Sequence, residues 1–260
     1  MGRVSRTARA LTRNRRWLPE ALRALVPFAR GTRFADQFPV RDLPDGAQCA
    51  SGNNPLRAYF ETHREGPGIW KWTHYFEIYH RHFQRFVGTD VQMAEVGIYS
   101  GGSLGMWRNY FGPRSRVLGI DIEPACAVYQ SDGIDVMIGD QSDRKFWADV
   151  RAAFPRLDIL IDDGGHHPEQ QIATLEEILP HLAPGGVYLC EDTHGAPNYF
   201  ASYAAGLASR LNAHRPRGFI DGVHSVHCYP LVTVIEKSAT SRWPLRDERR
   251  GTQWQPFRFD

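Results

Sequence analysis

Short aliphatic runs alternate with segments of helical periodicity between residues 92 and 212. This alternation predicts parallel strands joined by crossover helices, because two parallel neighbours need a connection of a dozen or more residues. The expected strands are Gln92–Ile98, Arg116–Ile122, Val136–Ile138, Leu157–Ile161 and Val187–Cys190. The expected helices begin at Ser103 and cover Lys145–Phe154, Pro168–Leu182 and Tyr199–Asn212.

The last two apolar runs, Val223–Tyr229 and Leu231–Glu236, are separated only by Pro230. This spacing leaves no room for a crossover helix, so the two strands must form an antiparallel hairpin. Parallel units that end in such a hairpin are typical of class I S-adenosylmethionine-dependent methyltransferases. We therefore predict an α/β, Rossmann-like fold with a mostly parallel seven-stranded sheet and a terminal antiparallel hairpin.

The flanking segments differ from this core. Residues 3–33 contain nine arginines but a single acid, Glu20, and the tail is polar. We expect a basic arm and linker over residues 1–45, and a helical lead-in over 46–90 that packs on the core. The lead-in includes an aromatic helix at Ile69–Phe86. The core then covers residues 91–237, and the polar tail covers 238–260.

The composition of the chain indicates which classes of partner are expected. The formal net charge of +2 does not point to nucleic acid. No apolar run approaches the roughly 20 residues that span a bilayer, so stable membrane insertion is not expected. The four cysteines are scattered, without CxxC pairs, which favours buried free thiols in a reducing cytoplasm. We expect a cytoplasmic homo-oligomer that acts on a small molecule.

A glycine-containing loop follows the first strand. Glycines there let backbone amides approach a ligand and direct the next helix toward an anionic group. A nicotinamide fingerprint needs a second glycine at position 99, which is tyrosine, whereas an acid before the first glycine is typical of S-adenosylmethionine sites. The predicted cofactor contacts in this loop are Glu95, Gly97, Ser100, Gly101 and Ser103.

Two later strand ends complete this cofactor site. Asp121 closes the second strand and is placed to accept the ribose hydroxyls. Asp140 and Gln141 follow the third strand and are placed to bind the adenine amino group. The order and spacing of these groups predict S-adenosylmethionine as the cofactor.

Acid pairs end the fourth and fifth strands. Asp162 and Asp163 precede Gly164-Gly165-His166-His167, and Glu191-Asp192 follows Cys190. Hard oxygen ligands suit Mg²⁺ or Mn²⁺, and such an ion makes an alcohol easier to deprotonate. We predict Asp163, Glu191 and Asp192 as ligands and His166 as general base. Because successive strand residues point to opposite faces, Asp162 is expected to face the methionine moiety of the cofactor. Helix capping by the acids is the alternative.

The chain resembles the metal-dependent sugar O-methyltransferases of macrolide tailoring, of the mycinamicin and tylosin type, which are relatives of the cephalosporin-hydroxylase-like methyltransferases. The segments that carry the resemblance are EVGIYSGGSLGMW (95–107), GIDI (119–122), GDQSD (139–143), IDDGGHH (161–167), PGGVYLCED (184–192) and VHSVHCYPLVTVIEK (223–237). The resemblance implies the same ligands and base, and transfer to a sugar hydroxyl of a glycosylated small molecule. The segment after Asp192 is shorter than is usual in that family, so the acceptor stays open.

Three other functions stay open at this point. A catechol O-methyltransferase needs the same cofactor and ion but aromatic walls around its acceptor. A non-catalytic cofactor-binding partner protein is a second alternative, against which the full set of acids and His166 stands. A hydroxylase-like activity is a third, but no 2-His-1-carboxylate iron site is evident in the sequence.

Overall fold

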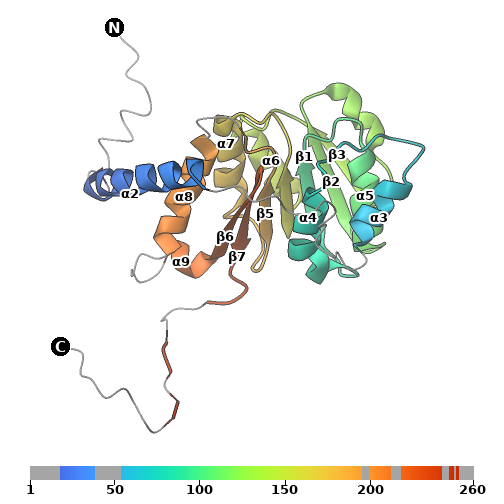
Figure 1. The fold of residues 1–260 in the computed structure, drawn as a ribbon. Helices are drawn as coiled ribbons and strands as arrows, with labels where there is room; N and C mark the ends of the chain where they lie inside the picture. The colour runs from blue at the N-terminus through green and yellow to red at the C-terminus, as the bar shows by residue number, and fades with distance from the viewer. Residues whose placement is uncertain are drawn as a thin grey trace, which may run out of the picture. The chain divides into compact units, whose positions relative to one another are not determined.

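The computed structural model describes residues 18–38, 54–194, 199–211, 218–241, 246–248 and 250–251 (Figure 1). The chain divides into two compact units, Met1–Ala50 and Ser51–Asp260. The first unit contains helix α2 (Leu18–Asp36), with Pro27 inside it. Most of the predicted arm and linker, and most of the tail, lie outside the described residues. Within the described part of the chain, no helix is both long and apolar enough to cross a membrane.

The second unit is built on one seven-stranded sheet in the order β3-β2-β1-β4-β5-β7-β6. The parallel strands are β1 (Gln92–Val96), β2 (Arg116–Asp121), β3 (Ile134–Ile138), β4 (Ile159–Asp162) and β5 (Val187–Cys190). Strands β6 (Val223–Tyr229) and β7 (Val232–Lys237) form the hairpin, and β7 pairs antiparallel with β5. The predicted fold class is confirmed.

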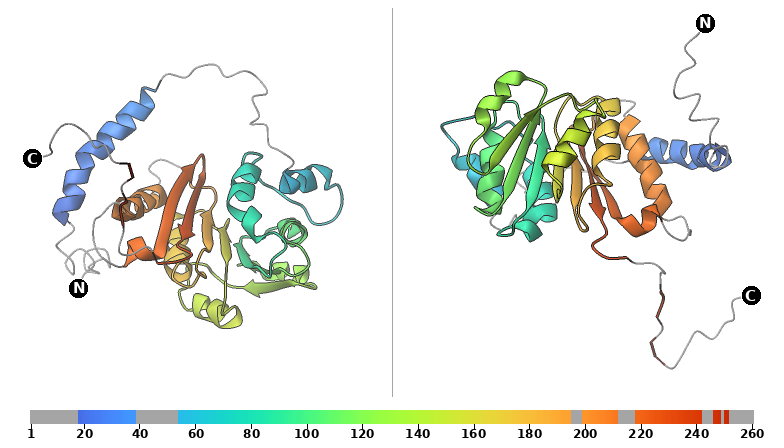
Figure 2. Two further views of the ribbon diagram at one scale, coloured as in Figure 1. Left: turned by 90° about the horizontal axis from the view of Figure 1, so that it is seen from below. Right: turned by 180° about the vertical axis from the view of Figure 1, so that it is seen from behind.

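Helices cover both faces of the sheet (Figure 2). On one face, α3 (Pro55–Thr62), α4 (Tyr75–Phe83) and α5 (Gly102–Phe111) pack with Met93, Ile159 and Ile161. On the other face, α6 (Phe146–Ala153), α7 (Pro168–Ile178) and α8 (Tyr199–Leu211) pack with Ala94 and Leu160. Strand residues alternate between the two cores because successive side chains of a strand point to opposite faces. Three short helical segments, η1 (Gln84–Phe86), η2 (Pro124–Tyr129) and α9 (Phe219–Gly222), complete the unit.

The predicted helix Ile69–Phe86 was wrong in its first part. Helix α4 begins at Tyr75, and residues 69–72 have no regular structure. Gly66, Pro67 and Gly68 precede this stretch and disfavour a helix there. The side chains of Lys71 and Trp72 then bind carboxylates at the strand ends, which a helix over these residues would not allow. The predicted helix Pro168–Leu182 ends earlier, at Ile178, because Pro180 follows.

The described cysteines only partly follow the prediction of buried thiols. Cys126 and Cys190 are free and buried, whereas Cys228 is free but exposed. Cys228 lies on β6, the last strand of the sheet, which explains its access to solvent. Cys49 lies outside the described residues.

Glu236 of β7 contacts His82 of α4 and Arg85 of η1. This contact predicts that part of the free energy of unfolding is lost at acidic pH. Glu236 Oε1 lies 3.0 Å from His82 Nδ1 and 3.0 Å from the Arg85 guanidinium. The hydrogen bond with His82, together with Arg85, lowers the pKa of Glu236 to about 2. Stability from a lowered carboxyl pKa is present above the unfolded-state value of about 4.3 and is lost as the pH falls toward 2. We expect Glu236→Gln to cost on the order of 2 kcal/mol at neutral pH, with the cost shrinking below about pH 4.

Urea unfolding of both proteins between pH 7 and pH 2 measures this difference. Glu61→Gln is the matched control, because Glu61 pairs with Arg57 on an exposed helix surface. A difference between wild type and Glu236→Gln that does not change with pH would contradict the prediction.

Candidate active site

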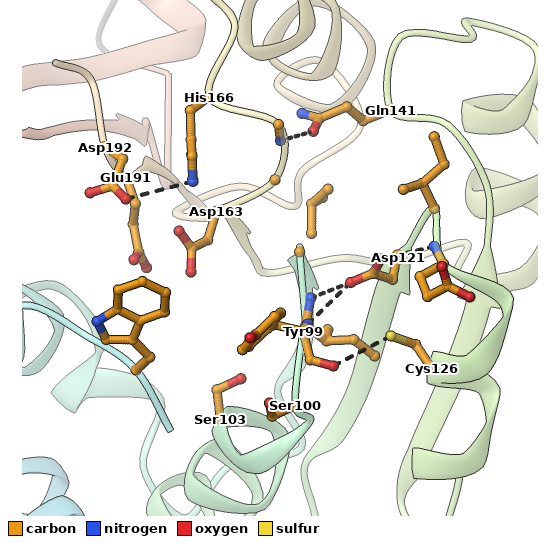
Figure 3. Close-up of a pocket in the computed structure, with 18 of the residues that line it drawn as sticks. Tyr99, Ser100, Ser103, Asp121, Cys126, Gln141, Asp163, His166, Glu191 and Asp192 are labelled. Carbon is orange, nitrogen blue, oxygen red and sulfur yellow. Dashed lines mark hydrogen bonds and ion pairs between the residues drawn. The ribbon is translucent and has the colours of Figure 1, made fainter. Parts of the chain in front are cut away.

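A cavity of about 940 Å³ opens at the carboxyl ends of the parallel strands. Loops after β1, β2, β3, β4 and β5 all contribute to its wall, together with the extended segment 68–72. Open parallel sheets bind ligands at this edge. In Figure 3, Tyr99, Asp121 and Cys126 lie on one side of the pocket, and Asp163, His166, Glu191 and Asp192 lie on the other.

The loop after β1 depends on glycine at two places. Gly97 has φ +82°, and a Cβ there would lie 2.0 Å from the carbonyl oxygen of Asp163. Gly101 has φ +73°, and a Cβ there would lie 2.4 Å from the ring of Tyr129. Glycine is therefore needed at both positions for backbone conformation and for close approach. Of the predicted loop contacts, Gly97, Ser100 and Ser103 line the cavity, whereas Gly101 makes room for Tyr129.

Asp121 organises this loop from the end of β2. Its Oδ2 accepts the backbone amides of Ile98 at 3.0 Å and Tyr99 at 3.1 Å, and its Oδ1 accepts the amide of Glu123 at 2.9 Å. A carboxylate has about four acceptor sites, so capacity is left for a ligand hydroxyl. Asp121 lines the cavity, where a ribose contact was predicted.

Asp140 and Gln141 both line the cavity. One oxygen of Asp140 accepts the amide of Ser142. The side-chain amide of Gln141 makes three hydrogen bonds within the protein. Its Nε2 donates to Asp162 and Thr174, and its Oε1 accepts the backbone amide of Gly165 at 2.7 Å. Gln141 therefore fixes the loop after β4, and because its Oε1 keeps a second acceptor site, its contact with adenine stays a prediction.

Two predicted cofactor contacts lie behind the pocket wall. Asp162 is fully buried, accepts hydrogen bonds from Gln141 and from the Tyr188 hydroxyl at 3.0 Å, and does not line the cavity. Strand alternation turns Asp162 toward the α7 face and leaves Asp163 to enter the pocket. Glu95 is also fully buried, where its Oε2 accepts hydrogen bonds from Ser103 and Trp107. Both predictions of a direct cofactor contact need this correction.

Asp163, His166 and Asp192 meet at the other side of the cavity. One ligand atom of each lies within 4.8 Å of the others, and His166 Nε2 lies 3.6 Å from Asp192 Oδ2. Capping of α7 does not account for Asp163, because α7 begins after His167 and its cap has no side-chain hydrogen bond. Burial raises the pKa of Asp163 to about 6, although the Lys71 ammonium acts in the opposite direction.

Glu191 lies deeper than its neighbour Asp192. Its side chain is 1% exposed, and its Oε1 accepts the Tyr79 hydroxyl at 2.6 Å. Its Oε2 faces Lys71 Nζ at 3.1 Å. Burial, with the charge of Asp163, raises the pKa of Glu191 well above its ordinary value. Glu191 thus lines the cavity, but it is not among the three residues whose ligand atoms lie within 4.8 Å of one another.

Backbone strain collects at this pocket. Tyr99, His166 and Asp192 have φ values of +45°, +53° and +50°, and all three line the cavity. A non-glycine residue in this left-handed region costs free energy and persists only where its surroundings require it. The strain at His166 and Asp192 sets the directions in which the predicted base and one predicted ligand point.

Lys71 is the functional residue that the sequence prediction missed. Its Nζ lies 2.5 Å from Asp163 Oδ2, 3.0 Å from Glu95 Oε1 and 3.1 Å from Glu191 Oε2. The chain has only three lysines among 31 basic residues, and this one stands between two tryptophans. The rarity of lysine and the two flanking tryptophans are the features of the sequence that could have singled out Lys71. From the same segment, Trp72 Nε1 and the Tyr75 hydroxyl donate to Asp192 Oδ1 at 3.1 and 2.6 Å.

The donors at this cluster fit a hard divalent cation. The side chains of Asp163 and Asp192 are 18% and 20% exposed, so an ion and a substrate can both reach their carboxylates. Carboxylate oxygens are the usual protein ligands of Mg²⁺ and Mn²⁺. The partly exposed His166 beside them remains available for proton transfer.

Comparison with known proteins finds methyltransferases. Residues 94–193 match a family described as Methyltransferase domain. The chain is 33% identical to demethylmacrocin O-methyltransferase of Streptomyces fradiae, over 82% of this chain and 59% of that protein. It is 28% identical to mycinamicin VI 2''-O-methyltransferase of Micromonospora griseorubida, over 70% of this chain and 51% of that protein.

A solved structure of the mycinamycin-pathway methyltransferase MycE, in complex with Mg and SAH, superposes with a TM-score of 0.59. The identity is 25%, and the match covers 75% of this chain and 57% of that one. The chain thus spans between about half and three-fifths of the length of these relatives. The domain match and the sequence identity agree: residues 94–193 of the chain belong to this methyltransferase domain family, and the chain is similar in sequence to these O-methyltransferases.

Proposed function

We propose that the chain transfers the methyl group of S-adenosylmethionine to a sugar hydroxyl of a glycosylated natural product, with the help of Mg²⁺ or Mn²⁺. The observation that carries this proposal is the meeting of Asp163, His166 and Asp192 at one side of a cavity. The opposite side is built by the glycine loop and Asp121. The names of the relatives, which include a mycinamicin and a rhamnosyl-tetracenomycin O-methyltransferase, support a glycoside acceptor.

The cofactor is assigned to the side of the cavity near β1 and β2. Asp121, whose carboxylate already holds the loop amides, accepts the ribose hydroxyls, and Asp140 accepts the adenine amino group. Gly97 lets the backbone approach closely, and Ser100 and Ser103 offer hydroxyls to the methionine end. Glu95 and Asp162 support these groups from behind, and Gln141, in the cavity wall, fixes the loop after β4.

The acceptor hydroxyl is assigned to the other side. Asp163, Glu191 and Asp192 are the proposed ligands of the cation, which supplies Lewis acidity that makes a hydroxyl easier to deprotonate. His166 takes the proton of that hydroxyl, and Asp192, 3.6 Å from its Nε2, stabilises the imidazolium that forms. Trp72 and Tyr75 hold Asp192 in place through its Oδ1.

A catechol is the second candidate acceptor, and a specific observation favours it. Trp70, Trp72 and Tyr99 line the cavity and are 83%, 55% and 74% exposed. Aromatic walls of this kind bind either the apolar face of a sugar or a flat ring. The names of the relatives favour the glycoside. We also propose a cytoplasmic location, supported by the buried free thiols of Cys126 and Cys190.

Transfer of an isotope-labelled methyl group to a panel of acceptors tests the proposal. The panel contains macrolide and aromatic polyketide glycosides, their aglycones, and simple catechols, with Mg²⁺ present. We expect label on the sugar of at least one glycoside and none on its aglycone. Label on catechols alone would overturn the glycoside assignment, and binding of S-adenosylmethionine without transfer to any acceptor would favour a non-catalytic partner protein.

A further inference from the structure

Lys71 is a deeply buried basic group of the pocket wall. Its side chain is 3% exposed, and it extends from the irregular segment before α4 to the ends of β1, β4 and β5. Its ammonium contacts Glu95, Asp163 and Glu191, whose side chains are 0%, 18% and 1% exposed. A buried ammonium needs such partners, because burial alone strongly disfavours its charge.

When Glu95, Asp163 and Glu191 are all ionised, the charges at this point do not balance without another cation. Glu95, Asp163 and Glu191 offer three carboxylates, and Lys71 supplies one positive charge within contact distance. Asp192, beside them, accepts hydrogen bonds from the neutral donors Trp72 and Tyr75, and His166 Nε2 lies 3.6 Å from its Oδ2. The excess of acid is what a divalent cation would neutralise. Two of its three proposed ligands, however, are already engaged by Lys71.

We propose that Lys71 is a resident cation that shares Asp163 and Glu191 with the incoming divalent ion, and that it thereby keeps binding of the ion weak and reversible. The inference rests on the metal site of the proposed function. Lys71 is a positioning residue here, since it acts through the ligands. It also joins the ion to the cofactor loop, because the same ammonium binds Glu95 at the end of β1.

A purely structural ion pair makes a different prediction. If Lys71 only stabilises the fold, its removal lowers stability and leaves the affinity for the ion unchanged. If it competes for the ligands, its removal strengthens ion binding, because the ion no longer meets a positive charge 2.5 Å from Asp163 Oδ2. Affinity for the ion therefore separates the two roles without any assay of activity.

The test is calorimetric titration of the full chain with Mg²⁺, and with Mn²⁺, in the absence of S-adenosylmethionine. We expect Lys71→Met to bind the ion at least about 10-fold more tightly than wild type. Lys71→Arg keeps the charge and is expected to stay within about 3-fold of wild type. Lys145→Met is the matched control, because Lys145 is exposed and does not line the pocket, and it is expected to change nothing.

A second variant covers the case in which Lys71→Met does not fold. Lys71→Met with Glu95→Gln removes both charges of one pair and leaves the proposed ligands intact, so it avoids an unpaired buried carboxylate at Glu95. It is also expected to bind the ion at least about 10-fold more tightly. Wild-type affinity, or weaker affinity, in a folded variant that lacks Lys71 would overturn the inference and leave the proposed function standing. Failure of every protein to bind either ion would overturn the metal site itself.

Discussion

Replacing His166 by alanine is expected to lower the turnover number by roughly 10²- to 10⁴-fold, the usual contribution of a general base. The hydroxyl of the proposed acceptor is a poor nucleophile until its proton is removed, and a ring nitrogen of His166 lies within 4.8 Å of carboxylate oxygens of Asp163 and Asp192 in the pocket wall. Because the cofactor is assigned to the side of Gly97 and Asp121, its affinity should stay within a few-fold of wild type. Initial rates of methyl transfer and calorimetric binding of S-adenosylmethionine measure the two quantities separately.

His167→Ala is the matched control for this variant. His167 is the adjacent residue, is exposed, does not line the cavity, and makes no side-chain hydrogen bond as the cap of α7. Its replacement should leave turnover nearly unchanged. Added imidazole should restore part of the activity of His166→Ala by filling the space of the missing ring. Near-normal turnover in His166→Ala, or an equal loss in His167→Ala, would contradict the role of His166.

Replacing Asp163 by asparagine is expected to be at least as damaging, with a loss of roughly 10²-fold or more in turnover. A cation that polarises an oxygen contributes several kcal/mol to the transition state, and each 1.36 kcal/mol is tenfold in rate. Asparagine keeps the shape of the side chain but removes the charge that faces the pocket. The backbone of Asp163, which lies against Gly97, is retained. Cofactor affinity should therefore change little.

Titration with Mg²⁺ checks the cause of that loss, since Asp163→Asn should bind the ion more weakly than wild type. Asp90→Asn serves as control, because Asp90 is 73% exposed, pairs with Arg156 and does not line the cavity. Unchanged affinity for the ion in Asp163→Asn would remove Asp163 from the set of ligands.

The fold could be predicted from sequence because its strands are short, apolar and regularly spaced. Strand β5 has the predicted bounds, and the close spacing of the last two strands requires the hairpin that is observed. The start of α4 could not be predicted. Aromatic residues continue at helical spacing through residues 69–74, but residues 69–72 have no regular structure, and Lys71 and Trp72 contact distant carboxylates. Tertiary contacts override local periodicity there.

The site was predictable to the extent that it follows from the ends of parallel strands. Asp121, Asp163 and Asp192 enter one cavity because their strands end at one edge of the sheet. The spacing of residues in the sequence does not determine which of these acids reach the cavity and which are buried behind its wall. Glu95 and Asp162 have the residue type of ligand contacts, yet full burial makes them supports for Ser103 and Gln141. Lys71 joins the site across 92 residues from Asp163, a distance over which no local pattern gives a signal.

Methyl transfer by the wild-type chain before and after exhaustive removal of divalent cations is the most direct test of the account. The reaction contains S-adenosylmethionine and a glycoside that is methylated in the acceptor panel. The account predicts that chelation lowers the rate by roughly 10²-fold or more, that added Mg²⁺ or Mn²⁺ restores it, and that binding of S-adenosylmethionine persists throughout. A full rate of transfer in the metal-free enzyme would contradict it.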